Sequence, residues 1–265
     1  MSIDWDDGVV PLPALSTYPD ADNHGPTPVP EWVITSGNAV EEDLGVLKTG
    51  KEADVNLVAR RLDGRTSLLA AKRYRDLRQR AFRNDVAYRA DRYLGPKAHR
   101  EQRAIDKGTR HGLALHAHLW AAHEFVTLAR LWQAGLPVPY PVQRLGTELI
   151  VEYLGDEEGA APRLVQVRVS PAERDDLLAQ AVDLLRALTA AGVVHGDLSP
   201  YNLLVWNGRL YAIDFPQAVH PSRNPNGLDL LHRDVTNVVG WFNRKGATVD
   251  AEALYAELLG DALMA

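Results

Sequence analysis

The residues of this 265-residue sequence whose types and spacing best suit chemistry lie in its second half. The motif His195-Gly196-Asp197 is followed by Asn202 and, further along the chain, by Asp214. Two carboxylates and an amide oxygen are hard ligands of the kind that Mg²⁺ prefers. Phosphoryl transfer uses such a set, because one Asp orients or deprotonates the acceptor while an Asn and a second Asp hold metal against the phosphates. The spacing therefore predicts a phosphoryl-transfer site, with Asp197 at the acceptor and Asn202 and Asp214 as metal ligands.

A predicted hairpin brings the two metal ligands together. Asn207-Gly208 is a strong turn signal between strands expected over residues 203–206 and 209–214. A two-residue turn at this place sets Asn202 opposite Ile213. Asn202 and Asp214 are then expected to lie roughly one strand spacing apart.

A lysine in the first half is expected to face the same site. An Asp63-Gly64 turn joins a strand over residues 53–60 to one over residues 67–74, and the resulting register places Lys72 opposite Val55. We expect Lys72 to bind the α- and β-phosphates of a nucleotide. Glu124, on a helix predicted over residues 111–133, is the acidic residue that would hold Lys72 in place.

The loop over residues 49–52, which we name the flap, is interpreted as a β-turn-β cover for nucleotide phosphates, with Thr49, Gly50 and Lys51 as binding residues. A Walker A loop is the alternative. It requires Ser or Thr after the lysine, but Glu52 follows here, and the loop leads into a strand instead of a helix. The spacing of the histidines gives no HExxH zinc site, and no G-x-S-x-G nucleophile elbow occurs.

Composition limits the class of protein. The chain has no cysteine, which excludes disulfide frameworks and thiolate metal sites and favours a reducing, cytoplasmic location. No uncharged run is long enough to span a membrane. The net charge of −6 hides an acidic start, because residues 1–47 hold nine acidic residues and no Lys or Arg. Residues 72–110 hold thirteen Lys or Arg against five Asp or Glu. This basic segment is interpreted either as a solvated segment or as a surface for RNA or phosphate.

The pattern of elements predicts an α+β fold with three parts. Residues 1–39 are Pro-rich and acidic and are expected to form a flexible leader. Residues 40–153 are expected to hold five strands and one helix, with the basic segment between them. Residues 154–265 are expected to hold a hairpin and helices over residues 170–191, 228–244 and 250–263, the first of which begins with a capping-box pattern, Ser170 to Glu173.

Together these motifs resemble the RIO family of atypical serine/threonine protein kinases, over roughly residues 43–246. The match consists of the flap with its following strand, the catalytic loop, the second carboxylate motif and a C-terminal set: Thr49-Gly50-Lys51-Glu52-Ala53-Asp54-Val55, His195-Gly196-Asp197-Leu198-Ser199-Pro200-Tyr201-Asn202, Ile213-Asp214-Phe215-Pro216-Gln217, Asn226, Arg233-Asp234-Val235, Phe242 and Lys245-Gly246.

The resemblance implies a two-lobed protein-kinase-like fold, with a small β-rich N-lobe and a reduced helical C-lobe. ATP would bind between the lobes, its adenine against the backbone of Glu152 to Leu154, with Mg²⁺ or Mn²⁺. It makes Asp197 the catalytic base and Asp214 both a metal ligand and a possible phosphate acceptor, so that the enzyme acts as a kinase or as a slow ATPase. The acceptor would be a protein Ser or Thr, the chain itself or Asp214. The family's tie to small ribosomal subunits implies RNA or a ribosomal particle as a partner.

Some positions depart from kinase patterns. Only 51 of the 265 residues follow Asp214, which leaves no room for a conventional activation segment. Ser199 stands where ordinary kinases carry a lysine, and Asn56 stands where an aromatic residue is usual in RIO proteins. Two alternatives therefore stay open: a small-molecule phosphotransferase of the aminoglycoside or choline type, and a weakly catalytic ATP-binding scaffold that docks RNA.

Overall fold

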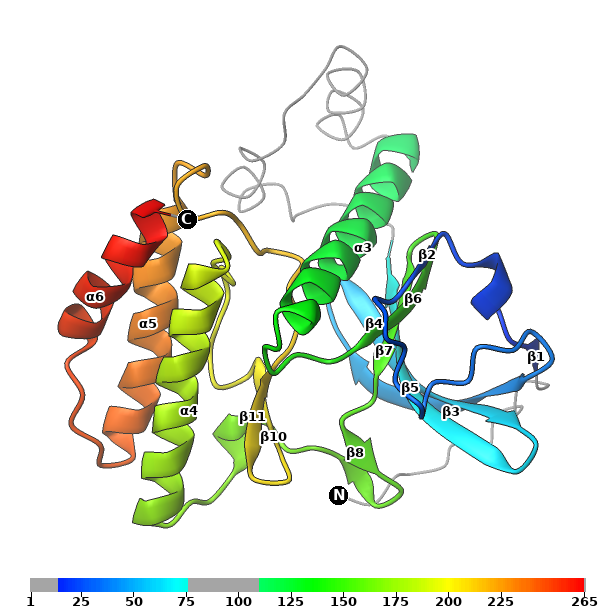
Figure 1. Ribbon diagram of the computed structural model, residues 1–265, viewed down its shortest axis with the longest axis horizontal. Coiled ribbons are helices and arrows are strands. Elements are labelled where there is room, and N and C mark those ends of the chain that lie inside the picture. The colour runs from blue at the N-terminus through cyan, green and yellow to red at the C-terminus, as the bar shows by residue number, and fades with distance from the viewer. Residues whose placement is uncertain (1–13, 76–109, 265) are drawn as a thin grey trace.

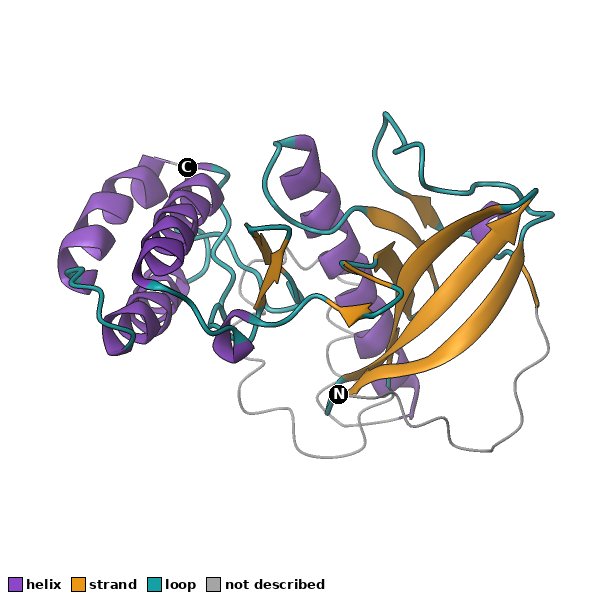
Figure 2. Ribbon diagram, turned by 90° about the horizontal axis from the view of Figure 1, so that it is seen from below, coloured by secondary structure: helices purple, strands orange, loops and turns teal. Residues whose placement is uncertain are grey.

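The computed structural model describes residues 14–75 and 110–264, which form a β-rich N-lobe and a helical C-lobe (Figure 1). Residues 1–13 of the expected leader (residues 1–39) and residues 76–109 of the basic segment (residues 72–110) lie outside the described residues. Figure 2 shows the large sheet at one end of the molecule and a group of helices at the other, with a long helix between them. This arrangement agrees with the predicted two-lobed α+β fold.

The N-lobe is built on a seven-stranded antiparallel sheet. In spatial order its strands are β1 (Ala14–Leu15), β3 (Val40–Thr49), β4 (Ala53–Leu62), β5 (Arg65–Tyr74), β7 (Glu148–Glu152), β6 (Pro141–Leu145) and β2 (Asn23–His24). The predicted turn at Asp63 and Gly64 forms, with Asp63 at φ 48° and Gly64 at φ 76°. Lys72 pairs with Val55 in the expected register.

The expectation of a flexible leader is wrong for residues 14–39. β1 pairs with β3 and β2 pairs with β6, so this stretch adds strands at both edges of the sheet. It also packs on one face, where Val33 and Trp32 contact a cluster that includes Leu69 and Ile150. The N-lobe therefore has more strands than the five predicted, because apolar side chains scattered among the prolines find partners far away in the sequence.

The opposite face of the sheet carries Lys72 and is covered by α3 (Arg110–Gln133). Strand side chains alternate between faces, and directly paired residues share one. Tyr74, two residues beyond Lys72, packs on α3 through Trp120 and Ala121. We call this surface the Lys72 face. Its position under α3 brings the helix residue Glu124 to the lysine.

The C-lobe consists of three helices and small hairpins packed around one large apolar core. Its elements are β8 (Gly155–Asp156), β9 (Gly159–Ala160), the 3₁₀ turn η3 (Leu164–Gln166), α4 (Pro171–Ala190), β10 (Leu203–Trp206), β11 (Arg209–Ala212), α5 (Gly227–Arg244) and α6 (Ala251–Met264). A second 3₁₀ turn, η1 (Tyr18–Asp20), lies in the N-lobe. α4 begins with the predicted box, in which Ser170 accepts from the Glu173 N–H. The core includes Phe125 from α3 and Leu149 from β7, so it joins the two lobes.

Candidate active site

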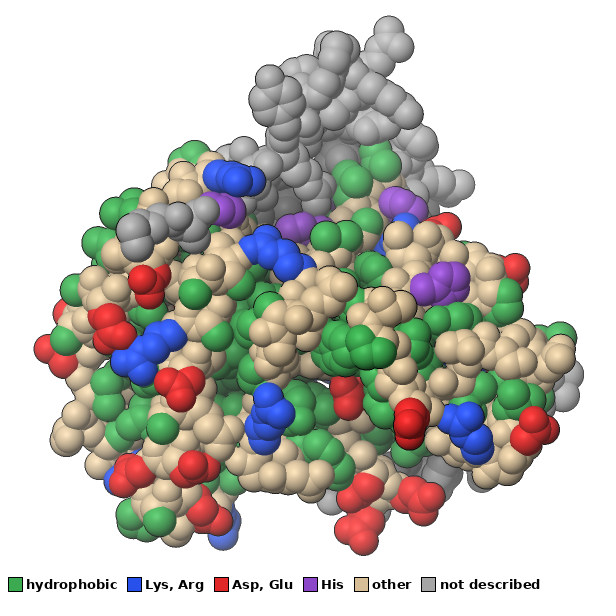
Figure 3. Space-filling model, viewed as in Figure 1, with side chains coloured by type: hydrophobic (Ala, Val, Ile, Leu, Met, Phe, Trp, Pro, Cys, Tyr) green, Lys and Arg blue, Asp and Glu red, His purple; other side chains and the backbone are tan. Residues whose placement is uncertain are grey.

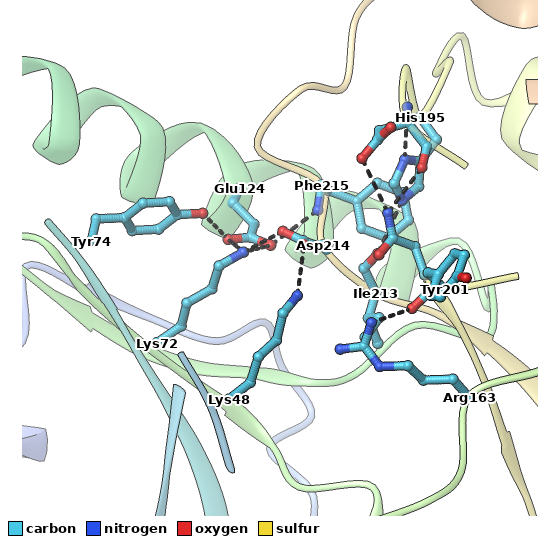
Figure 4. Close-up of polar contacts among 12 residues, drawn as sticks. Lys48, Lys72, Tyr74, Glu124, Arg163, His195, Tyr201, Ile213, Asp214 and Phe215 are labelled. Atoms are coloured by element: carbon cyan, nitrogen blue, oxygen red, sulfur yellow. Dashed lines mark hydrogen bonds and ion pairs between the residues drawn. The ribbon is translucent and has the colours of Figure 1, made fainter. Parts of the chain in front are cut away.

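Three charged side chains from three separate elements meet at the centre of the site (Figure 4). Lys72 Nζ lies 2.9 Å from Glu124 Oε1 and 2.6 Å from Asp214 Oδ1. Lys72 comes from β5, Glu124 from α3, and Asp214 from the loop that follows β11. The predicted pair of Lys72 and Glu124 is therefore formed, and the same lysine also reaches the second carboxylate motif.

Glu124 accepts hydrogen bonds from three different parts of this cluster. Its carboxylate is almost fully buried and accepts from Lys72, from the Tyr74 hydroxyl and, at 3.0 Å, from the Phe215 backbone N–H. Lys72 also lies against the ring of Tyr74, 5.0 Å from its centroid. Because all three donors point at one carboxylate, the orientations of β5, α3 and the Asp214 loop are fixed together.

The mutual charges of the cluster decide its protonation states. Burial alone would lower the pKa of Lys72, but the negative charges of Asp214 and Glu124 raise that pKa well above its usual value. Burial acts to raise the pKa of Asp214, yet the charge and hydrogen bond of Lys72, with smaller contributions from Lys48 and His195, lower it to about 2. Lys72 is therefore an ammonium and Asp214 a carboxylate at neutral pH.

A second lysine, which the sequence did not indicate, faces the same carboxylate. Lys48 Nζ on β3 lies 3.9 Å from Asp214 Oδ2, and Figure 4 shows its side chain directed at Asp214 from the strand that leads into the flap. The Lys48 side chain is 42% exposed and that of Asp214 is 32% exposed.

The catalytic loop lies beside Asp214. The predicted register of the second hairpin is present, since Leu203 pairs with Ala212 and the Ile213 N–H donates to the Asn202 carbonyl at 3.0 Å. Asn202 is buried, and its amide nitrogen donates to the Asp197 carbonyl at 2.9 Å and contacts Asp197 Oδ2 at 3.4 Å. The Asp197 side chain is exposed, so it can meet an acceptor from solvent.

A buried carboxylate on α5 fixes the backbone of the catalytic loop through hydrogen bonds. Asp234 is 1% exposed and accepts from the backbone N–H groups of Gly196 and Leu198, both at 2.8 Å. Burial raises its pKa to about 6, against the lowering effects of His195, the two backbone hydrogen bonds and Arg233. The Arg233 guanidinium also donates to the Gly196 carbonyl. Asp234 thus fixes the backbone on both sides of Asp197.

Asn202 and Asp214 have the chemistry of a magnesium site. Because the Asn202 amide nitrogen donates to Asp197, the amide oxygen is turned away from that residue. Within residues 14–75 and 110–264 no group of three or more His, Asp or Glu side chains is arranged around a metal position. A cation held by Asn202 and Asp214 would therefore take its other oxygens from phosphates or water, as magnesium commonly does. The two residues fit such an ion.

The flap and the segment Glu152 to Leu154, which we call the hinge, make local contacts of their own. Thr49 and Lys51 are exposed, and the Gly50 N–H donates to the Ala53 carbonyl at 2.9 Å across the turn. At the hinge, the Glu152 carboxylate accepts from the Tyr140 N–H at 3.0 Å, and the Leu154 carbonyl accepts from the Ala161 N–H at 2.9 Å. The nucleotide-binding roles predicted for Thr49, Gly50, Lys51, Glu152 and Leu154 stay predictions.

Asn56, which departs from the family pattern, has a definite contact. Its amide nitrogen donates to both oxygens of Asp43, at 3.1 Å and 2.9 Å. Asp43 also accepts from the Gly45 N–H at 3.0 Å and from Arg73 at 3.0 Å. A polar side chain at position 56 therefore fastens β3 to β4 near the flap, on the face opposite Lys72.

In this two-lobed fold, a Lys–Glu pair on the N-lobe faces an Asp–Asn loop and a second Asp. This arrangement defines a protein-kinase-like phosphotransferase. A sequence profile of the RIO domain matches residues 63–254. The chain is 36% identical over 218 residues to the RIO-type serine/threonine-protein kinase Rio1 of Haloferax volcanii, covering 82% of this chain and 69% of that protein. The chain belongs to the RIO family.

Solved structures agree with this fold. The Rio2 kinase from Chaetomium thermophilum superimposes with a TM-score of 0.58 at 22% identity, over 83% of this chain and 63% of that chain. A structure of the Rio2 kinase–ADP/Mg²⁺–phosphoaspartate complex from the same organism gives a TM-score of 0.55 at 20% identity, over 84% of this chain and 70% of that chain. In the part of the chain that the structure describes, no helix is both long enough and apolar enough to cross a membrane.

Proposed function

We propose that this chain is a RIO-type ATP- and magnesium-dependent kinase or ATPase, which transfers the γ-phosphate of ATP to a protein Ser or Thr, to itself or to Asp214. The observation that carries the proposal is the convergence of Lys72, Glu124 and Asp214 beside the Asp197–Asn202 loop. Catalysis of this kind depends mainly on positioning and on charge, and the cluster supplies both.

Lys72 and Glu124 position the phosphates in this proposal. Lys72 is held at the Lys72 face by Glu124, which also accepts from Tyr74 and the Phe215 N–H. The fixed ammonium would contact the α- and β-phosphates of ATP. Since Asp214 is the other acceptor of Lys72, the lysine exchanges one anionic partner for another when nucleotide binds.

Asn202 and Asp214 would hold the divalent cation against the phosphates. When bound, magnesium neutralises charge that develops on the transferring phosphoryl group. Mn²⁺ accepts the same oxygen ligands and would replace it.

The exposed hairpin β8–β9, which carries Asp156, Glu157 and Glu158, lies immediately beyond the hinge in the chain. Acidic side chains gather at the lower edge of the molecule in Figure 3. We expect repulsion from the carboxylates of Asp156, Glu157 and Glu158 to disfavour an orientation that places the phosphates at this hairpin.

Asp197 would orient the acceptor and take its proton. For a Ser or Thr acceptor, the hydroxyl oxygen bonds to the γ-phosphorus, the bond to the β,γ-bridging oxygen breaks, ADP leaves and the proton passes to Asp197. For Asp214 as acceptor, a carboxylate oxygen is the nucleophile and no proton moves. The Rio2 complex that contains phosphoaspartate supports the second route. Hydrolysis of that intermediate would give ATPase activity.

The remaining predictions of substrate and partner belong to this proposal. The adenine would lie against the backbone of Glu152 to Leu154. RNA or a ribosomal particle would meet the basic segment, and the chain would act in the cytoplasm.

The test combines intact-mass measurement with phosphate release after incubation with magnesium and ATP. Wild type, Asp197→Ala, Asp214→Ala and the control Asp183→Ala are compared; Asp183 lies on α4 with its side chain 75% exposed. We expect wild type and the control to gain one phosphoryl group in mass or to release phosphate, and both site variants to lose this activity. A hydroxylamine-labile adduct that wild type forms and Asp214→Ala does not form would point to Asp214 as the acceptor.

The outcomes separate the alternatives. If wild type binds ATP but neither gains phosphate nor releases it, the scaffold interpretation replaces the enzyme. If small alcohols are phosphorylated in preference to protein, the small-molecule phosphotransferase replaces it. If Asp197→Ala keeps full phosphate release while Asp214→Ala loses it, Asp197 is not the base of the ATPase reaction.

A further inference from the structure

We propose that Lys48 is a second phosphate-positioning residue of this site, whose ammonium binds the phosphoryl group as it passes between ATP and its acceptor. The inference deepens the proposed function and rests on it. Lys48 lies on β3, outside the flap and the catalytic motifs. The inference starts from the contact between Lys48 Nζ and Asp214 Oδ2.

The strand register places Lys48 on the Lys72 face. Lys48 pairs with Val55 on β4, and Val55 pairs with Lys72 on β5. Residues that pair directly in an antiparallel sheet share a face. Lys48 and Lys72 therefore stand in one row, two strands apart, with Val55 between them, and both reach the same carboxylate of Asp214.

A β-bulge produces this orientation. Val46 pairs with Asn56, and the next pair is Lys48 with Val55, so Leu47 is an extra residue in β3. Without the bulge, Lys48 would share a face with Val46, which is the face of Asn56 and lies opposite Lys72. One inserted residue turns the following side chain to the other face of the sheet. The bulge thus sends Lys48 to the site.

The ion pair itself adds little to the folded state. Both side chains are partly exposed, at 42% and 32%, and such pairs contribute weakly to stability. Asp214 already has a closer cation, because Lys72 lies 2.6 Å from its other oxygen. A second ammonium beside Lys72 is also opposed by repulsion between like charges. These features suit a role in which the Lys48 ammonium binds an anion that carries more negative charge than the Asp214 carboxylate alone.

Phosphoryl transfer supplies such an anion at this position. The Lys72 ammonium contacts Oδ1 of Asp214, and the Lys48 ammonium faces Oδ2 of the same carboxylate. A phosphoryl group bound to Asp214, or a γ-phosphate beside it, would therefore lie within range of both ammonium groups. Lys72 remains tied to buried Glu124, whereas Lys48 has a flexible and partly exposed side chain. Lys48 can therefore follow the phosphoryl group during transfer.

The test compares nucleotides that differ in the γ-phosphate. Dissociation constants for ADP and for the non-hydrolysable β,γ-imido analogue of ATP are measured by calorimetry with magnesium. The proteins are wild type, Lys48→Met, Lys48→Arg and the control Arg61→Met, which removes a similarly exposed cation at the far end of β4. Single-turnover phosphate release and thermal melting are measured on the same proteins.

We expect Lys48→Met to weaken binding of the ATP analogue about tenfold to hundredfold, as for one lost charge-assisted hydrogen bond, and to slow single turnover. ADP binding should stay within about twofold of wild type, as expected for the loss of a contact to the γ-phosphate alone. Lys48→Arg should recover much of the loss, and Arg61→Met should match wild type in both measurements.

Each contrary result has its own meaning. Equal weakening of ADP and analogue would show that Lys48 merely shapes the flap, and an unchanged Lys48→Met protein would show a surface ion pair without function; either outcome overturns the inference. If wild type binds neither nucleotide, the proposed function fails and Lys48 has no phosphoryl group to position. The melting temperatures distinguish these results from loss of folding.

Discussion

Replacing Asp234 by asparagine should increase stability at neutral pH while it impairs catalysis. Asp234 is 1% exposed and accepts two backbone hydrogen bonds from the catalytic loop. Its pKa of about 6 in the folded protein, against a usual value of 3.8, means that burial of the charge outweighs those bonds. Protonated aspartate and asparagine have the same shape and each offers one acceptor oxygen, so they are closely matched at low pH.

The magnitude and sign follow from proton linkage. Between pH 3.8 and about 6 the folded protein binds more protons at Asp234 than the unfolded chain does, so its stability falls as pH rises through this window. A pKa shift of about two units corresponds to about 3 kcal/mol. The carboxamide of the variant carries no charge, so the variant escapes this loss. Asp234→Asn should therefore equal wild type in stability near pH 4 and exceed it by about 3 kcal/mol at pH 7.

Urea unfolding followed by tryptophan fluorescence at several pH values measures this difference. Contributions from other carboxylates largely cancel between the two proteins. Single-turnover phosphate release should fall about tenfold or more in the variant at pH 7, because one backbone N–H of the loop then meets an amide N–H₂ instead of a carboxylate oxygen. A variant that is less stable than wild type at pH 7 would refute the reasoning, since the backbone hydrogen bonds would then outweigh charge burial.

Three further substitutions test one contact of the site and two structural contacts away from it. Tyr74→Phe removes a donor from Glu124 and should lower kcat about tenfold in steady-state phosphate release; an unchanged kcat would show that the hydroxyl does not position Lys72. Ser170→Ala removes the cap of α4 and should cost about 1 kcal/mol in urea unfolding; a change in kcat would contradict its purely structural role. Arg60→Met should cost about 3–5 kcal/mol because it leaves Glu41 without its buried partner, and resistance to limited proteolysis equal to wild type would contradict this.

Short-range features of the fold could be predicted because turn chemistry fixes register locally. Asp63 and Gly64 determine that Lys72 faces Val55, and the second hairpin determines that Asn202 neighbours Asp214. Each prediction needs only the turn length and the alternation of side chains. The pairing of Lys72 with Glu124 was predicted from the acidic residue on the helix that follows the strand of Lys72, and no turn register fixes that contact.

Long-range features could not be predicted in this way. Val33 lies in a proline-rich stretch whose composition suggests disorder, yet it packs with Leu69 because the sheet offers an apolar face that this stretch alone cannot reveal. Asp234 reaches the catalytic loop across 38 residues of sequence. Lys48 depends on a bulge at Leu47, and a one-residue irregularity in register carries no clear signal in composition or periodicity.

Asp214 shows why the site requires such long-range support. Its φ of 74° lies in the left-handed region, which costs a non-glycine residue of order 1–3 kcal/mol. The backbone is held there from both sides, because the Ile213 N–H donates to Asn202 and the Phe215 N–H donates to buried Glu124. The strain directs the Asp214 carboxylate at the lysines, and it persists because α3 and the catalytic loop oppose its relaxation. Asp214 through its backbone and Asp234 through its buried charge thus both lower stability, the first in the loop after β11 and the second behind the catalytic loop. Such a loss of stability is expected where catalysis depends on positioned charges.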